Sequence, residues 1–305
     1  MATYPLVSAV IPTRNRPELL RRAVASVFSQ DYAGEIECIV VFDQSEPAPV
    51  GLGVPPKRRI RLITNGRSPG LAGARNSGVL AARGELVGFC DDDDEWLAQK
   101  VRLQVDKLAS NPSVDIVASG MYVYRNGSAI ARVPKEPILR FGDFLRSRRM
   151  EIHQGTILVS RETFLDKIGL VDEAIPGGYG EDYDWMLRAA RLNGIATISQ
   201  PLARIHWSDE SWFVGRWKML VSALHYLLEK YPEFQQEPVG LARIYGQIAF
   251  ALAASGKGPE ARAYAKRCLH LDARQLRAYL ALLVAARILR PNFVVTTANR
   301  LGRGI

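Results

Sequence analysis

The chain has 305 residues, of which 48% are hydrophobic and 9% aromatic, and its 40 basic and 31 acidic residues give a net charge of +9. This composition is typical of a globular protein and excludes a disordered chain. No heptad or Gly-X-Y period occurs, which excludes coiled-coil and collagen-like proteins. The length allows one large α/β domain with an appendage or two ordinary domains.

The cysteines and the N-terminus indicate the cellular setting. Cys38, Cys90 and Cys268 lie far apart, with neither a disulfide framework nor a zinc-finger spacing. A reducing cytosol is the simplest setting, so the expected location is cytoplasmic. The first residues do not have the pattern of a signal peptide. The longest apolar run, residues 278–286, is far shorter than the roughly 20 residues of a spanning helix, so we expect a soluble or peripheral protein.

Strand-like and helix-like segments alternate up to about residue 207. Apolar runs cover residues 6–11, 38–42, 60–64 and 86–90, and apolar residues at helical spacing cover 18–29 and 71–82. Strands that are apolar on both faces and separated by helices predict an α/β fold with a mostly parallel sheet flanked by helices. Such sheets bind ligands outside the carboxyl ends of their strands.

Helical segments dominate the rest of the chain. They cover residues 211–231, 239–255, 259–269 and 274–289, with proline or glycine between them. We therefore predict a catalytic α/β domain over residues 1–207, with a ligand-binding half over about 1–95 and a second half over about 96–207. The all-helical region over 208–305 is predicted to be an appendage, because a freestanding helical repeat needs at least three copies.

Four consecutive carboxylates, Asp91 to Asp94, directly follow the fourth apolar run. One interpretation is a solvated face or a cap for the helix that begins near Trp96. The other is a cation site, because a divalent cation would relieve the repulsion between these side chains at the ligand-binding edge of the sheet. Oxygen ligands select Mg²⁺ or Mn²⁺, and such ions also bind substrate phosphates, which implies a diphosphate partner.

Seven short segments occur in an order and spacing that are together highly specific. They are VSAVIPTRNR (7–16), SVFSQ (26–30), IVVFDQS (39–45), ARNSG (74–78), ARGE (82–85), FCDDDD (89–94) and GEDYDWMLR (180–188). With these segments the sequence resembles the family 2 inverting glycosyltransferases, which have the GT-A nucleotide-sugar fold, over about residues 6–207. The resemblance implies transfer of a sugar from a nucleoside diphosphate donor to an acceptor hydroxyl.

The resemblance implies a donor site at the first strand ends. Asp43 would accept a hydrogen bond from the imide N–H of uracil or thymine, which implies a UDP- or dTDP-sugar. Pro12 and Arg14 would line the nucleoside pocket, and Arg75 would approach the nucleotide and the diphosphate. The family usually has a second acidic residue before Asp43, and here that position is Phe42.

The acidic run occupies the family's Asp-X-Asp positions. By resemblance, Asp93 would bind Mn²⁺ or Mg²⁺ directly, and Asp91 would approach the ribose or the waters of the metal. Asp92 is the middle position of this donor-binding motif, and Asp94 is expected to turn inward or to cap the next helix. His206 is a candidate third metal ligand or a hydrogen-bond donor to the diphosphate, and a structural histidine is the alternative.

By resemblance, Asp182 is the general base that takes the acceptor proton, with Glu181 the second choice. Both lie near the predicted start of a helix, where carboxylates also stabilise the helix dipole. His153 is a weaker candidate for the acceptor cleft. Sugar specificity is expected in the loops of residues 125–155.

Three classes of function remain open: a sugar transferase, a metal-dependent hydrolase of nucleotide sugars or phosphate esters, and a helical scaffold without catalysis. The acceptor is expected to be a carbohydrate, a lipid-linked sugar or a small molecule. Nucleic acid is a poor candidate partner, because no RNA-binding motif places aromatic residues among the basic clusters. In the basic C-terminus, the helix over residues 276–289 has arginines at both ends and is a candidate for peripheral contact with a membrane that bears a lipid-linked acceptor; packing against the preceding helix is the favoured alternative.

Overall fold

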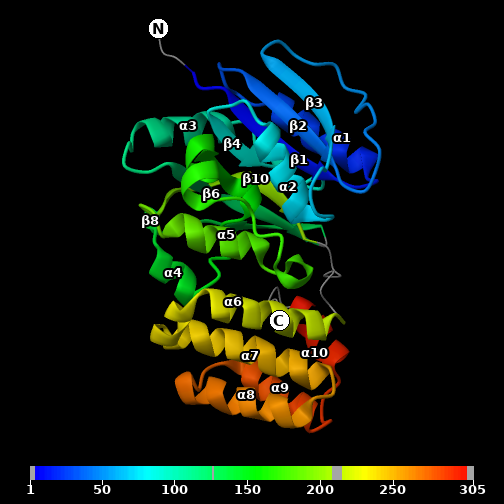
Figure 1. The fold of residues 1–305 in the computed structure, drawn as a ribbon, viewed down its shortest axis with the longest axis vertical. Coiled ribbons are helices and arrows are strands. Elements are labelled where there is room, and N and C mark those ends of the chain that lie inside the picture. Colours follow the sequence, from blue (N-terminus) through cyan, green and yellow to red (C-terminus); the bar gives the residue numbers. More distant parts are fainter. Residues whose placement is uncertain (1–3, 126, 208–214, 301–305) are drawn as a thin grey trace. The chain divides into compact units, whose positions relative to one another are not determined.

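The computed structural model describes residues 4–125, 127–207 and 215–300. The chain divides into two compact units, and each is described by itself. The first unit contains residues 1–141, 149–173 and 181–207, and the second contains residues 142–148, 174–180 and 208–305. Figure 1 shows the elements of both units.

The first unit is built on a ten-stranded mixed sheet. Its strands are β1 (Val7–Thr13), β2 (Ile36–Phe42), β3 (Arg58–Thr64), β4 (Leu86–Phe89), β5 (Glu95–Trp96), β6 (Ile116–Arg125), β7 (Ser128–Arg132), β8 (Ile138–Leu139), β9 (Ile157–Ser160) and β10 (Ile195–His206). Its helices are α1 (Pro17–Phe28), α2 (Leu71–Ala81), α3 (Lys100–Ala109), the start of α4 (Phe141–Arg146), the short η1 (Gln154–Thr156), the π-helical η2 (Thr163–Ile168) and α5 (Glu181–Ala190).

The strand order is β3-β2-β1-β4-β9-β6-β10-β5, with β7 paired to β6 and β8 paired to β10. The first four strands in this order pair in parallel, which confirms the predicted α/β architecture for the ligand-binding half. Beyond β4 the sheet is mixed, since β9 pairs antiparallel with both β4 and β6, whereas β10 and β6 are parallel. The carboxyl ends of β1, β2 and β4 therefore lie together at one edge.

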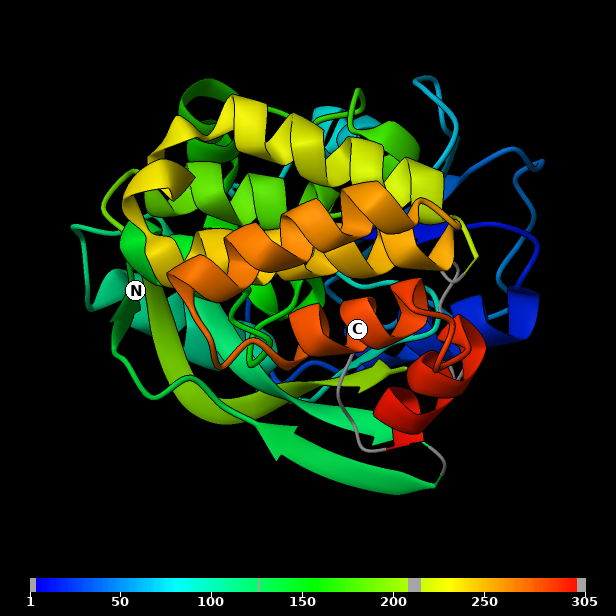
Figure 2. The same ribbon diagram turned by 90° about the horizontal axis from the view of Figure 1, so that it is seen from below.

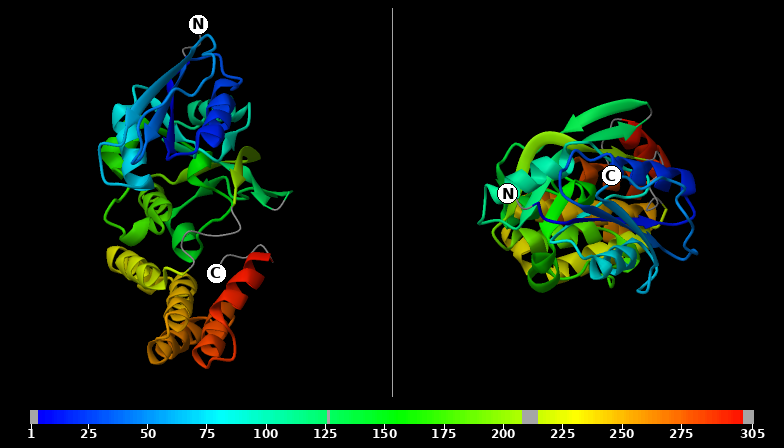
Figure 3. Two further views of the ribbon diagram at one scale, coloured as in Figure 1. Left: turned by 90° about the vertical axis from the view of Figure 1, so that its right-hand side faces the viewer. Right: turned by 90° about the horizontal axis from the view of Figure 1, so that it is seen from above.

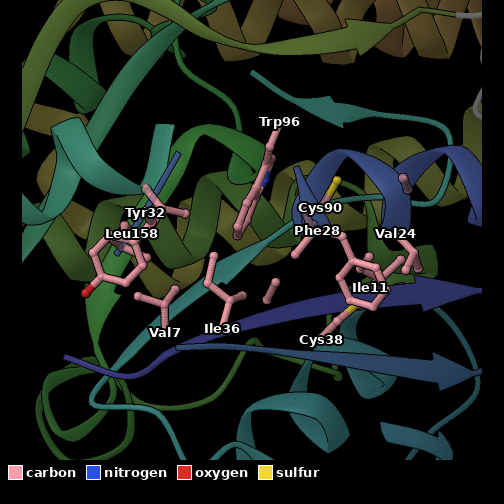
Figure 4. Packing of buried hydrophobic residues seen from close by; sticks show 14 of the residues in the cluster. Val7, Ile11, Val24, Phe28, Tyr32, Ile36, Cys38, Cys90, Trp96 and Leu158 are labelled. Carbon is pink, nitrogen blue, oxygen red and sulfur yellow. The ribbon is translucent and has the colours of Figure 1, made fainter. Parts of the chain in front are cut away.

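The two faces of the parallel strands are covered by different helices. The cluster in Figure 4 joins apolar side chains of α1 to one face of β1 and β2, where Ile11 and Cys38 lie. On the opposite face, α2 packs so closely that a Cβ at Gly78 would lie 2.3 Å from Val10 Cγ1. Only glycine permits this approach, which fixes the position of α2 over the strands.

A fully buried lysine lies at the start of α3. Lys100 Nζ donates hydrogen bonds to Gln104 Oε1 at 2.6 Å and to the Ile157 carbonyl at 3.4 Å, and it lies 4.2 Å from the centre of the Trp96 ring. Gln104 Nε2 in turn donates to the Thr156 carbonyl at 2.7 Å. Burial lowers the pKa of Lys100 to about 7. This polar group therefore connects α3 to η1.

We expect Lys100→Met to change how stability depends on pH. A lysine of the unfolded chain titrates near 10.5, so between that value and about 7 the unfolded state binds a proton that the folded state does not. The free energy of unfolding of the wild type should therefore fall, relative to Lys100→Met, by about 1.4 kcal/mol for each pH unit of acidification in this window. Urea unfolding of both proteins at several pH values tests this, and parallel curves would contradict it.

The second unit is helical. Its elements are the end of α4, η3 (Pro176–Gly178), α6 (Trp217–Lys230), η4 (Pro232–Gln236), α7 (Pro238–Ala254), α8 (Gly258–Leu271), α9 (Leu276–Ala285) and α10 (Pro291–Arg300). The predicted helix over 211–231 begins in residues that lie outside the described part of the chain, and its remainder matches α6. Helix α7 packs against α6, α8 and α9, as Figures 2 and 3 show from two further sides. In the described residues we find no helix with the length and apolar character that crossing a membrane requires.

Candidate active site

Asp43 follows β2 directly and is buried. Its carboxylate accepts hydrogen bonds from Asn65 Nδ2 at 2.8 Å and from the Gly70 amide at 3.1 Å. Burial alone would raise the pKa of Asp43, but these bonds and the charge of Arg14 outweigh it and lower that pKa. Pro12 is buried in β1, whereas Arg14 is exposed. An ionised acceptor and a cation thus lie at the adjacent ends of β2 and β1.

Two of the four consecutive carboxylates are paired with the segment after β1. Asp92 is buried. It accepts a hydrogen bond from Thr13 Oγ1 at 2.7 Å and forms an ion pair with Arg16 at 2.5 Å. The same guanidinium donates to Asp93 Oδ2 at 2.9 Å. Burial raises the pKa of Asp92 to about 6. Asp93 is the more exposed of the two side chains, so its ion pair with Arg16 is open to solvent.

Arg75 of α2 holds the acidic run to the start of α5. Its guanidinium is 2% exposed and donates from Nη2 to both oxygens of Asp91, at 2.9 and 3.0 Å. From Nη1 it donates to Glu181 at 3.2 Å. Burial by itself would raise the pKa of Asp91, but the adjacent Arg75 lowers it. A partly buried and a buried carboxylate from distant parts of the sequence therefore share one buried cation.

Asp94 points inward, as expected. Its carboxylate is buried and accepts the backbone N–H of His206 at 2.9 Å. Burial and the nearby charge of Asp91 raise the pKa of Asp94 well above its usual range. The ring of His206 stacks on Tyr124 with centres 5.3 Å apart, and its buried Nδ1 has no hydrogen-bond partner in the described part of the chain.

One group of side chains has the spacing of a metal site. Asp91, Asp94 and His153 each offer a ligand atom within 4.8 Å of the others, and no second group of this kind occurs among the described residues. A Cβ at Gly155 would lie 3.3 Å from His153 Nδ1 and 3.7 Å from Asp94, so glycine leaves this space open. However, His153 Nδ1 already accepts the Gly155 N–H at 3.1 Å. The two carboxylates are therefore the readier ligands, and two suffice for Mg²⁺ or Mn²⁺.

The predicted base lies in the first turn of α5. Asp182 is half-buried, whereas Glu181 is buried and bound to Arg75. The negative charge of Asp182 favours the protonated forms of both Arg75 and His153, so it lies within electrostatic range of both. Asp182 thus combines proximity to the acidic run with access to solvent.

The residue next to Arg75 fixes the segment that leads towards α5. Asn76 Nδ2 donates to the Val171 carbonyl, and Asn76 Oδ1 accepts the Val171 N–H, both at 2.8 Å. Asn76 also donates to Glu173, which binds Arg67 and Ser68 in the loop before α2. Helix α2 therefore positions both the acidic run and the segment before α5.

The structure brings Asp91, Arg75 and Glu181 together and places Asp182 near them. Asp43, Pro12 and Arg14 lie at the same sheet edge, at the neighbouring strand ends. Sequence analysis did not single out Arg16 or Asn76. Both lie in the matched segments, and the parallel pairing of β1 with β4 brings Arg16 to the acidic run.

Comparison with known proteins identifies the family. The profile of glycosyl transferase family 2 matches residues 8–167. An Escherichia coli protein, the UDP-Glc:alpha-D-GlcNAc-diphosphoundecaprenol beta-1,3-glucosyltransferase WfgD, is 26% identical over 194 residues, which are 64% of this chain and 73% of that protein. The chain spans 53% of another curated E. coli relative.

Solved structures share the fold. Residues 1–349 of S. aureus TarS in complex with UDP-GlcNAc align with a TM-score of 0.63 and 18% identity, covering 97% of this chain and 92% of that one. The mannosyltransferase PcManGT from Pyrobaculum calidifontis, in complex with GDP-Man and Mn²⁺, aligns with a TM-score of 0.53 and 19% identity, covering 98% and 85%. These matches confirm the GT-A fold. The chain belongs to glycosyl transferase family 2 and is a glycosyltransferase.

Proposed function

We propose that this protein transfers a sugar from a UDP- or dTDP-sugar to an acceptor hydroxyl, with inversion at the anomeric carbon and with Asp182 as the general base. The observation that carries the proposal is the bridge from Asp91 through Arg75 to Glu181. This bridge holds the diphosphate-binding run and the base-bearing turn of α5 beside each other. An inverting transferase needs both, because the acceptor attacks as the diphosphate leaves from the opposite face.

The donor nucleotide would bind along the ends of β1 and β2. The ionised Asp43 would accept a hydrogen bond from the imide N–H of a pyrimidine base, and Arg14 would face the nucleotide. The UDP-GlcNAc complex of TarS, which has the same fold, supports a uridine nucleotide.

A divalent cation fits the acidic run. Asp91 would bind the cation together with a second carboxylate. That second ligand is Asp94 if the group of Asp91, Asp94 and His153 forms the site, and Asp93 if the Asp-X-Asp motif does. The ion pair between Arg16 and Asp93 is open to solvent and therefore weak, so Asp93 can exchange it for the cation. His153 completes the observed group, although its Nδ1 already accepts the Gly155 N–H, and His206 is not part of that group. When bound, the cation would act as a Lewis acid that stabilises negative charge on the departing diphosphate.

The base assignment rests on access. Asp182 is half-buried at the start of α5, whereas the neighbouring Glu181 is buried and binds Arg75, so we assign the acceptor proton to Asp182. The named E. coli relative acts on a sugar linked to diphosphoundecaprenol, so we propose an acceptor of the same kind, a lipid-linked or polymeric carbohydrate.

Binding calorimetry with UDP, dTDP and GDP, with and without Mn²⁺, tests the donor site. We expect metal-dependent binding of UDP or dTDP that weakens at least tenfold in Asp91→Asn, since a directly coordinating carboxylate is lost. Comparing Asp93→Asn with Asp94→Asn identifies the second ligand as the one whose loss abolishes the metal dependence. The exposed Asp166→Asn is the matched control.

Two outcomes would contradict the proposal. If no nucleotide binds with or without metal, the acidic run is structural, and a helical scaffold without catalysis becomes the favoured class of function. If the donor is consumed equally fast with and without an acceptor, the protein is a hydrolase of nucleotide sugars.

A further inference from the structure

The net positive charge of this chain comes almost entirely from its C-terminal end. Residues 257–305 contain ten Lys and Arg against two acidic residues, which gives +8 of the total +9. Residues 1–256 are therefore almost neutral, although they contain the candidate active site. The last 49 residues therefore account for nearly all of the net charge of the chain.

On α8 the basic side chains share the outward face. Arg262, Lys266 and His270 are exposed and lie at intervals of four residues, while Ala261 and Ala265 are buried beneath them. In the described part of the chain no carboxylate pairs with these three side chains. They line an open depression of about 620 Å³, to which Arg267, Leu269 and Leu282 also contribute.

On the adjacent α9 the outward face is apolar. Leu276, Tyr279 and Leu283 are 63%, 45% and 37% exposed and lie on one side of the helix, opposite the buried Ala278 and Ala281. Both α8 and α9 pack against α7 and against each other, so their exposed faces point away from α7. Figure 2 shows the two helices side by side, and Leu282 of α9 lining the depression on α8 shows that their surfaces are continuous.

We propose that this face, the basic row of α8 with the apolar stripe of α9, binds an anionic lipid bilayer. A membrane interface offers both components at once: phosphate headgroups for the cations and the acyl boundary for the leucines. A soluble polyanion or a nucleic acid would leave the apolar stripe in water. A second copy of the chain would bring two rows of like charge together. This inference goes beyond the proposed activity and does not depend on it.

Sedimentation of the full chain with lipid vesicles tests the proposal. We expect binding to vesicles of phosphatidylcholine that contain phosphatidylglycerol, weak binding to phosphatidylcholine alone, and release by added salt. Arg262→Gln/Lys266→Gln should weaken binding at least tenfold, because each cation at such a surface contributes about fivefold. Leu276→Ser/Leu283→Ser should also weaken it, and its remaining binding should be more sensitive to salt.

The matched control is Arg83→Gln/Lys135→Gln, which removes two exposed cations from the first unit and should leave vesicle binding nearly unchanged. Circular dichroism and urea unfolding, measured in parallel, should be the same in all variants, which shows that they fold without reference to the donor site. The proposal is overturned if the wild type does not bind anionic vesicles, or if the control variant loses as much binding as Arg262→Gln/Lys266→Gln. It is also overturned if analytical ultracentrifugation shows a dimer of the wild type that Leu276→Ser/Leu283→Ser abolishes.

Discussion

Replacing Asp182 by Asn should lower kcat by roughly two to four orders of magnitude while the dissociation constant of the donor nucleotide stays the same. The amide keeps the size of the side chain but cannot take the acceptor proton. Because Asp182 is half-buried and Asn has nearly the same size and shape as Asp, the fold should tolerate the change. The measurement is release of nucleoside diphosphate under saturating donor and acceptor, with calorimetry of the nucleotide alongside.

Asp166→Asn is the control for this experiment, since Asp166 is an exposed carboxylate outside the site. It should leave kcat unchanged. An unchanged kcat in Asp182→Asn would show that Asp182 is not the general base. Loss of nucleotide binding in the same variant would instead assign Asp182 to the donor site.

Replacing Arg75 by Met should reduce the free energy of unfolding by about 3–5 kcal/mol, because the buried Glu181 and the partly buried Asp91 lose the buried cation that they share. The double variant Arg75→Met/Glu181→Gln should lose less stability than the sum of the two single losses, by about 0.5–3 kcal/mol, because it also removes the negative charge that Arg75 compensates at Glu181. Urea unfolding of the single and double variants measures both effects.

The exposed ion pair between Arg59 and Glu35 provides the comparison. Arg59→Gln removes a cation from the surface, where such pairs contribute under about 1 kcal/mol. If Arg75→Met and Arg59→Gln have equal effects on stability, the buried bridge has no special part in holding the site together.

The parts of the site that the sequence predicts are those next to a strand in the chain. Asp43 and the acidic run follow β2 and β4 directly, so an alternation of apolar runs and helices is enough to place them at one sheet edge. The helices of the C-terminal region are equally local, because their apolar spacing and their proline and glycine boundaries are written in consecutive residues.

Pairings between distant residues could not be predicted in this way. Arg75 and Glu181 are 106 positions apart, and nothing in either local pattern specifies that they meet. The mixed part of the sheet is a second case, since β9 enters between β4 and β6 although 67 residues separate the end of β4 from its start. The inward turn of Asp94 is expected from the sequence, but its partner, the His206 backbone N–H, could not be predicted, because it lies in β10, the last strand of the unit.

The pair of hydrogen bonds between the Asn76 side chain and the Val171 backbone has a consequence for the order of folding. While the chain is being made, β1 to β4 and the helices between them can associate early, but Asn76 and Arg75 then have no partners at the α5 end. Closing a loop of nearly one hundred residues is entropically costly and slow. The complete site, with the base-bearing turn of α5 fixed beside the acidic run, should therefore form late on the ribosome, only after α5 has emerged.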